Sequence, residues 1–172
     1  MSTPTSSDRP SIRPATSADV AAIAAIYNET ILLRDATMVL EQVDDAYVRT
    51  WLDRLDPRES LWILSESDRI QGWGIVKFYS DRPGYARACE TSVFIRRSEI
   101  GRGLGSRLQE KLLDAAREAD FHHVVVRIWA ANESSIAMHR KFGFTVVGTQ
   151  KEVGFVDDRW VDVTIMQCVL DA

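Results

Sequence analysis

Hydrophobic positions recur at helical spacing in two stretches of the N-terminal third of the chain. Thr16 and Asp19 have the spacing of a helix capping box. They precede apolar positions three or four residues apart, namely Val20, Ile23, Ala24 and Tyr27. The second stretch ends before Pro57 and has the apolar positions Val48, Trp51, Leu52 and Leu55. The pattern therefore predicts two amphipathic helices.

The pattern then changes to short, apolar, β-prone runs. Residues 61–66 and 70–79 form two such runs, and the polar Ser67-Asp68-Arg69 separates them, which predicts a β-hairpin. Residues 80–84 have the composition of a turn, and residues 87–95 are expected to form a further strand. We therefore expect an antiparallel sheet to begin near residue 61.

A helical pattern returns after Gly103, with apolar positions Leu104, Leu108, Leu112 and Ala115. Residues 124–129 are a β-branched run typical of a strand buried on both faces, and we expect this strand to pair in parallel with residues 87–95. Residues 132–142 predict a short helix that Gly143 closes in a left-handed conformation. Further strands are expected to start at residues 144–147 and to run over residues 160–169.

This order of elements predicts a single α/β domain over residues 11–172. Its expected core is a mixed, mostly antiparallel, twisted sheet with a central parallel pair and about four helices. Residues 1–10 are rich in Ser, Thr and Pro and are expected to form a flexible N-terminal tail. The length of 172 residues suits one domain, and 45% hydrophobic with 27% charged residues is typical of a globular protein.

Charge and composition exclude several classes of partner. The net charge of −4 gives no basic field for nucleic acid or an anionic membrane, and no apolar run is long enough to span a bilayer. The N-terminus lacks the parts of a signal peptide, so we expect a cytoplasmic protein. Cys89 and Cys168 lack metal-ligand spacing and are expected to be reduced core thiols. His122 and His123 are adjacent and lack a third ligand, so no metal is assigned.

Residues 101–106, Gly-Arg-Gly-Leu-Gly-Ser, form a glycine-rich turn between a predicted strand and a predicted helix. Glycine lets backbone N–H groups approach a phosphate closely, and the helix N-terminus favours an anion. Local positive charge is expected from Arg96, Arg97, Arg102 and Arg107. By itself such a loop is compatible with a dinucleotide, a nucleotide or a structural turn. A Rossmann site would place the loop after the first strand, and a Walker loop would end in Lys-Ser/Thr. This loop comes late in the chain and has no such lysine, so both nucleotide-binding hypotheses lose support.

The arrangement resembles the GCN5-related N-acetyltransferase (GNAT) superfamily, which has a strand, then Arg/Gln-x-x-Gly-x-Gly/Ala, then a helix. The match here is Gly103-Leu104-Gly105 after Val93-Phe94-Ile95. Ile100 stands where the family has Arg or Gln, and Arg102 is a candidate to replace that side chain. The resemblance implies cofactor contacts from Val93, Phe94, Ile95, Gly101, Arg102, Gly103, Leu104, Gly105, Ser106 and Asn132. Asn132 is equally expected as a helix N-cap.

Within that superfamily the chain resembles phosphinothricin and methionine-sulfoximine acetyltransferases over nearly its whole length. Among the matching pieces are Ile26-Tyr27-Asn28, Glu90-Thr91-Ser92-Val93-Phe94-Ile95, Asn132-Glu133-Ser134-Ser135-Ile136 and His139-Arg140-Lys141-Phe142-Gly143-Phe144. The resemblance implies acetyl-CoA as the donor, the α-amino group of a small amino acid or analogue as the acceptor, and a homodimer.

Glu90 is the candidate general base. An amine attacks only when it is deprotonated, and burial inside a strand would raise the pKa of Glu90 toward the useful range. The alternative is a solvent-facing glutamate at a strand edge. A backbone N–H near residues 93–95 is expected to stabilise developing negative charge if the strand splays there, as the resemblance implies.

His139 stands where the superfamily often has a tyrosine that serves the leaving thiolate, and its alternative is a packing or capping residue. Candidate acceptor contacts are Tyr27, Asn28, Tyr79, Tyr85 and Arg87, although core packing also explains the aromatic residues. Two alternatives to this function stay open: an acyl-CoA-binding module without turnover, and an acetyltransferase of a peptide N-terminus or a polyamine.

Overall fold

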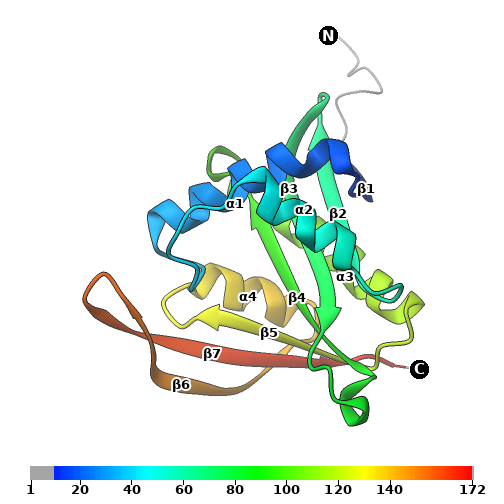
Figure 1. Ribbon diagram of the computed structural model, residues 1–172. Coiled ribbons are helices and arrows are strands. Elements are labelled where there is room, and N and C mark those ends of the chain that lie inside the picture. The colour runs from blue at the N-terminus through cyan, green and yellow to red at the C-terminus, as the bar shows by residue number, and fades with distance from the viewer. Residues whose placement is uncertain (1–9, 172) are drawn as a thin grey trace, which may run out of the picture.

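The computed structural model describes residues 10–171, so the tail predicted for residues 1–10 lies outside it apart from Pro10. One mixed sheet of seven strands, in the order β1-β2-β3-β4-β5-β7-β6, runs through these residues (Figure 1). The strands are β1 (Ser11–Pro14), β2 (Ser60–Glu66), β3 (Arg69–Phe78), β4 (Ala88–Ile95), β5 (His123–Trp129), β6 (Thr145–Val156) and β7 (Arg159–Val169). Every neighbouring pair is antiparallel except β4 and β5.

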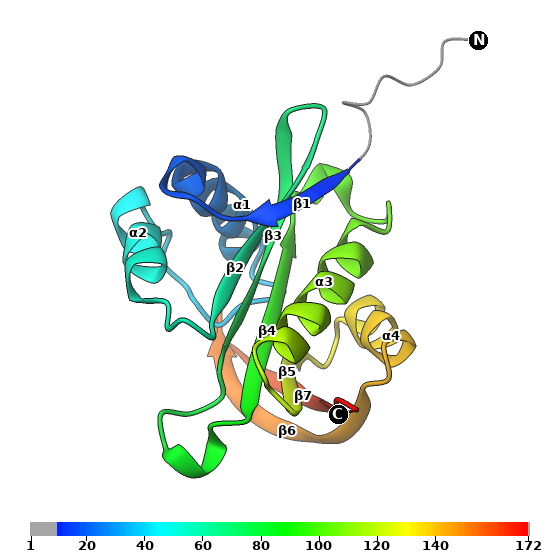
Figure 2. The ribbon, with the colours of Figure 1, turned by 90° about the vertical axis from the view of Figure 1, so that its right-hand side faces the viewer.

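Four α-helices cover the two faces of the sheet. They are α1 (Val20–Leu33), α2 (Asp45–Arg54), α3 (Leu104–Glu118) and α4 (Glu133–Lys141). Figure 2 shows α1 and α2 on one side of the sheet and α3 and α4 on the other. This confirms the predicted α/β class, the mostly antiparallel sheet and the central parallel pair. Among residues 10–171, no helix is both long and apolar enough to cross a membrane.

Each face of the sheet has its own hydrophobic core. On the α3 side, Leu112 and Leu108 are fully buried against the sheet, as the helical spacing predicts. On the α1 side, Ile23 and Ile26 pack against Trp73 of β3. Cys89 and Cys168 are free thiols within the first core, which confirms that prediction. Helices and sheet therefore form three layers, with the sheet in the middle.

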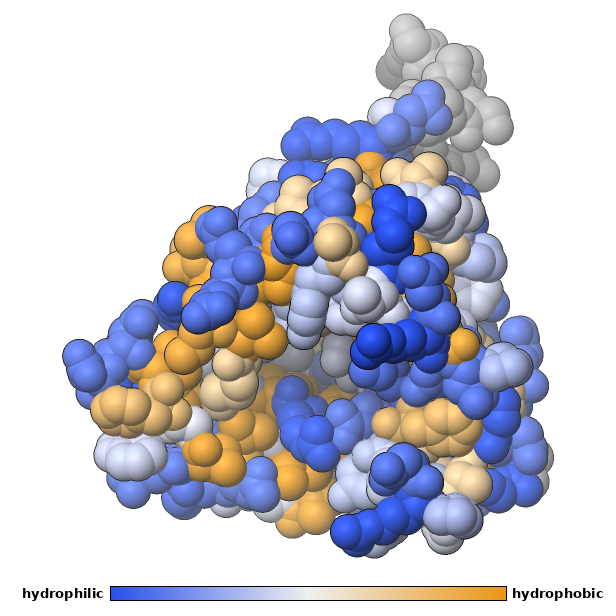
Figure 3. Space-filling view, viewed as in Figure 1, coloured by the Kyte–Doolittle hydropathy of each residue, from blue (hydrophilic) through white to orange (hydrophobic). Residues whose placement is uncertain are grey.

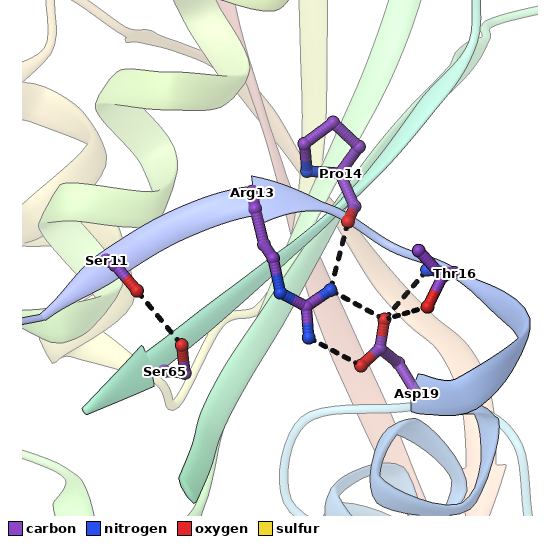
Figure 4. A network of polar contacts seen from close by, with 6 residues as sticks. All are labelled: Ser11, Arg13, Pro14, Thr16, Asp19 and Ser65. Carbon is purple, nitrogen blue, oxygen red and sulfur yellow. Dashed lines mark hydrogen bonds and ion pairs between the residues drawn. The ribbon is translucent and has the colours of Figure 1, made fainter. Parts of the chain in front are cut away.

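The edge strand β1, which the sequence pattern did not reveal, leads into α1 through a polar network (Figure 4). Arg13 donates to both carboxylate oxygens of Asp19, at 2.7 and 2.8 Å. The same carboxylate accepts from the backbone N–H and the hydroxyl of Thr16, which completes the predicted capping box. Asp19 is only 3% exposed, and its contact with Arg13 lowers its pKa to about 2. The network therefore fixes the direction in which the chain enters α1.

Candidate active site

The central parallel strands β4 and β5 are hydrogen-bonded over only part of their length. Their pairing runs from Ala88 opposite His123 to Glu90 opposite Val125, although both strands continue for several more residues. A cavity of about 390 Å³ lies where they separate, lined by residues 91–95 of β4 and 126–129 of β5. The splay implied by the family resemblance is therefore present.

The separated edge of β4 directs backbone groups into this space. Tyr79 donates its N–H to the carbonyl of Ala88, and Arg96 donates to the carbonyl of Gln71, so even-numbered residues of β4 bond to the β3 side. Backbone groups alternate in direction along a strand. Those of Val93 therefore point to the side where β5 has moved away, which is where a donor for developing negative charge is needed.

The glycine-rich loop forms one end of the same cavity. Gly101 and Gly103 have φ values of 87° and 77°, in the left-handed region that other residues rarely adopt. Gly103 is the N-cap of α3, and no side chain caps this helix, so its first amides are open to a ligand. Gly101, Gly103, Leu104, Gly105 and Ser106 all line the cavity. The backbone is therefore arranged as an anion-binding helix N-terminus.

Three of the four arginines near the loop are paired with carboxylates, which corrects the expectation that they supply free positive charge. The pairs are Arg96 with Glu29, Arg97 with Asp35, and Arg102 with Glu66 and Glu99. Attraction for an anion therefore rests mainly on backbone amides and the helix dipole. Arg102 does not line the cavity, so its contact with a cofactor stays a prediction. Ile100 lines the cavity and is 56% exposed.

Glu90 forms a two-point ion pair with Arg127 of β5. The distances are 2.7 Å from Nη2 to Oε1 and 3.0 Å from Nη1 to Oε2. The pair arises from strand register: Glu90 lies opposite Val125, and Arg127 follows two residues later on the same face of the sheet. Burial raises the pKa of Glu90, while Arg127 and Lys77 act in the opposite direction. The net rise favours a role in proton transfer.

A second cavity of about 570 Å³ lies near the connection between β3 and β4. Tyr79, Tyr85 and Arg87, three of the predicted acceptor contacts, line it together, and the two tyrosine rings meet edge to face with centroids 5.4 Å apart. Figure 3 shows that the face carrying α1 and α2 is hollowed below these helices, with hydrophobic and hydrophilic side chains at the border. The structure thus brings these three candidates into one site.

The other two predicted acceptor contacts are engaged in holding the fold. The ring of Tyr27 packs in the α1-side core against Trp73, and its hydroxyl lies 3.0 Å from the hydroxyl of Thr37. Asn28 makes two 2.8 Å hydrogen bonds with the backbone of Val43 and so fixes the chain before α2. Neither side chain lines either cavity. Their contact with an acceptor stays a prediction.

Asn132 and His139 both line the first cavity. Asn132 caps α4 by accepting from the N–H of Ser135 at 3.1 Å, as predicted. His139 is 6% exposed, and its Nδ1 donates to the carbonyl of Ser135 at 2.8 Å, because a carbonyl oxygen can only accept. Burial lowers the pKa of His139. A neutral imidazole with Nδ1 protonated presents a lone pair at Nε2, so donating a proton there requires the imidazolium.

Comparison with known proteins identifies the family. The sequence matches the acetyltransferase (GNAT) domain over residues 12–165. The chain belongs to the GNAT acetyltransferase family. It is 36% identical over 164 residues to the L-methionine sulfoximine/L-methionine sulfone acetyltransferase of Pseudomonas aeruginosa, covering 94% of this chain and 95% of that one.

Two further relatives agree with this assignment. The phosphinothricin N-acetyltransferase of Streptomyces coelicolor is 32% identical, covering 88% of this chain and 91% of its own. A Salmonella typhimurium protein solved with its cofactor acetyl-CoA has a TM-score of 0.90 and 32% identity, covering 94% of each chain. The fold is therefore that of a GNAT domain.

Arg127 is the residue of this GNAT site that sequence reasoning missed. It is the single charged residue in the run from Val124 to Trp129, which is otherwise apolar. A lone charged side chain in a buried strand requires a partner, and this requirement could have marked Arg127 as a site residue from the sequence. The identity of the partner depends on the register between β4 and β5, which the local sequence does not specify.

Proposed function

We propose that this enzyme transfers an acetyl group from acetyl-CoA to the α-amino group of a small amino acid or analogue, such as methionine sulfoximine or phosphinothricin. The observation that carries the proposal is that the pairing of β4 with β5 ends at Glu90, whose ion-pair partner Arg127 lines both cavities. The names of the relatives favour this class of acceptor.

The residues of the first cavity fit coenzyme A. The left-handed glycines and the uncapped N-terminus of α3 suit a diphosphate, and the gap between two strand edges suits an extended amide-containing arm. Arg97 and Trp129, both in the lining, carry buried N–H groups that donate to no partner among the described residues. When bound, acetyl-CoA supplies an activated acetyl group.

The chain's own groups then have separate tasks. Glu90 accepts the proton of the ammonium group, directly or through a water, and its raised pKa brings it closer to the working pH. The backbone N–H of Val93 donates to the oxygen on which negative charge develops. Asn132 holds the extended arm. His139 is proposed to serve the leaving thiolate as an imidazolium, which its lowered pKa makes less populated than in an ordinary histidine.

The second cavity is the proposed acceptor site. Its described lining includes Arg87, Arg127, His122 and His123 but no Asp or Glu. The carboxylates beside that lining, Glu90 and Asp120, are already paired with Arg127 and Arg87, so a polyamine would find no unpaired carboxylate there, whereas the carboxylate of an amino acid can compete for either arginine. The charge of the site therefore favours an amino acid over a polyamine.

We also propose a cytoplasmic homodimer. The two free, buried thiols suit a reducing compartment. Strand β6 is at the edge of the sheet, and exposed apolar side chains gather on β6 and β7, namely Val146, Val147, Val153, Phe155 and Trp160. Such a patch is typical of an interface. Light scattering on the purified protein should give twice the mass of the chain, and a monomer at all concentrations would contradict the dimer.

The activity is tested by incubating the protein with acetyl-CoA and a panel of acceptors, then following the released thiol of CoA. Cys89 and Cys168 are buried, so a thiol-reactive dye reports CoA with little background from the protein. The panel contains methionine sulfoximine, phosphinothricin, free amino acids, peptides and a polyamine. Release with the amino acids supports the proposal. Preference for peptides or a polyamine, or CoA binding without release on any amine, would contradict it.

A further inference from the structure

Arg127 lies between the two cavities described above. Among the described residues, it is the one that belongs to the lining of both the space between β4 and β5 and the proposed acceptor site. Its guanidinium lies over the ring of Tyr79, 5.9 Å from the centroid, and Tyr79 lines the acceptor site. The side chain is 51% exposed, so it has room to change rotamer. A change of rotamer can therefore turn its guanidinium from Glu90 toward an acceptor.

The second arginine of the acceptor site is held differently. Arg87 forms an ion pair with Asp120 at 2.5 Å, and its side chain is 64% exposed. The charge of Arg87 is thus offset by the exposed carboxylate of Asp120, and no ion pair joins Arg87 to Glu90 within the described residues. The only ion pair of Arg127 within residues 10–171 is the one with Glu90. An incoming carboxylate that binds Arg127 must therefore compete with Glu90 itself.

We propose that Arg127 is the specificity-determining residue that binds the carboxylate of the acceptor, and that this binding draws its guanidinium away from Glu90. The inference rests on the proposed function, in which Glu90 is the base. Arginine suits the task because its planar fork can bind one carboxylate at two points. The acceptor's own carboxylate thereby releases the group that deprotonates its amine.

The release changes the basicity of Glu90 in a defined direction. Two cations act on its carboxylate, Arg127 from β5 and Lys77, which lies opposite it in β3. Losing a nearby positive charge raises the pKa of a carboxylate, so Glu90 becomes a stronger base once an acceptor occupies Arg127. An amine that lacks a carboxylate leaves the ion pair intact and Glu90 weakly basic. The enzyme should therefore favour amino acids over the corresponding amides and simple amines.

The test uses three acceptors that differ only at the carboxylate: methionine sulfone, its carboxamide and the amine without the carboxyl group. Wild type should have the highest kcat/KM for the acid. In Arg127→Met, which keeps a side chain of similar length, kcat/KM for the acid should fall about 10- to 100-fold. The values for the amide and the amine should stay level or rise. Arg127→Lys should recover part of the preference, because it restores the charge without the fork.

A pH profile separates this role from a structural one. With the carboxamide as acceptor, the acidic limb of kcat/KM should move to higher pH in Arg127→Met, because Glu90 has lost a cation. A merely structural defect would lower kcat/KM for all three acceptors by the same factor and leave the acidic limb of the profile in place. That result would overturn the proposal. Arg49→Met, which makes the same change at an exposed arginine of α2, is the matched control and should keep both the preference and the limb.

Arg87→Ala tests the alternative that Arg87, and not Arg127, binds the carboxylate of the acceptor. If it abolishes the preference for the acid while Arg127→Met keeps it, Arg87 binds the carboxylate and the proposal is overturned. Absence of CoA release by wild type with all three acceptors would instead contradict the proposed function, and this inference with it. Wild-type turnover with an unchanged preference in Arg127→Met would contradict the inference alone.

Discussion

The substitution Glu90→Gln tests whether Glu90 acts as a general base, apart from its role in packing and in the contact with Arg127. Glutamine has nearly the same shape and keeps one oxygen that accepts from Arg127, so one of the 2.7 and 3.0 Å contacts has a neutral counterpart, while the amide nitrogen, a donor, cannot replace the other. The substitution therefore removes the proton acceptor while keeping the packing. Because burial raises the pKa of Glu90 in the folded protein, its ionisation costs stability as pH rises through that value. The variant should accordingly be no less stable than wild type at pH 8.

The size of the effect depends on pH in a way that can be worked out. An amine with a pKa of about 8 is about 1% deprotonated at pH 6 and about 90% at pH 9. A general base contributes roughly 10²- to 10⁴-fold, chiefly where the amine arrives protonated. The ratio of wild-type to variant kcat/KM should therefore be about 10³ at pH 6 and shrink by roughly 100-fold by pH 9.

The assay is the initial rate of CoA release at low acceptor concentration between pH 5.5 and 9.5. Glu110→Gln is the matched control, because it makes the same chemical change at an exposed position of α3. Its profile should overlay that of wild type. A wild-type to Glu90→Gln ratio that stays constant across the range would refute the base assignment, since a positioning defect has no reason to follow the ionisation of the amine.

Two further predictions concern stability. Asp19→Asn should lower stability at pH 7 by about 1–2 kcal/mol through the weakened contact with Arg13. Since the pKa of Asp19 is depressed to about 2, its advantage is full above the ordinary aspartate pKa and is lost as pH falls toward 2, so melts of both proteins should converge there. Gly72→Ala should cost about 1–3 kcal/mol, because the new Cβ would lie 2.5 Å from Cδ1 of Ile95. Gly84→Ala meets no atom within 4 Å, and equal melting temperatures for the two alanine variants would contradict this reasoning.

The sequence predicted the elements whose pattern is long and regular. The two amphipathic helices, the hairpin of β2 and β3 and the parallel pairing of β4 with β5 are all confirmed. Strand β1 was missed because it has four residues, ends in Pro14 and has no clear alternation. Strand β6 extends well beyond residue 147. The sequence did not predict this length, because two register breaks in β6 interrupt the alternation on which such a prediction depends.

At the site, the local sequence indicated the loop and Glu90 but not the electrostatic partners. The pairing of Arg102 with Glu66 joins residues far apart in the chain, and so does that of Arg127 with Glu90. The first depends on where the loop before α3 lies against the end of β2, and the second on the register of β4 with β5. Counting arginines near the loop therefore overestimated its positive charge, and the one arginine that bears on Glu90 was overlooked.

The central claim is that the amides at the start of α3 and along the open edge of β4 hold coenzyme A. Amide chemical shifts recorded during a titration with CoA test it directly. We expect saturable shifts at residues 103–106 and at Val93, with the hairpin between β6 and β7 unchanged. Unmoved amides at residues 103–106 in excess CoA would contradict the account.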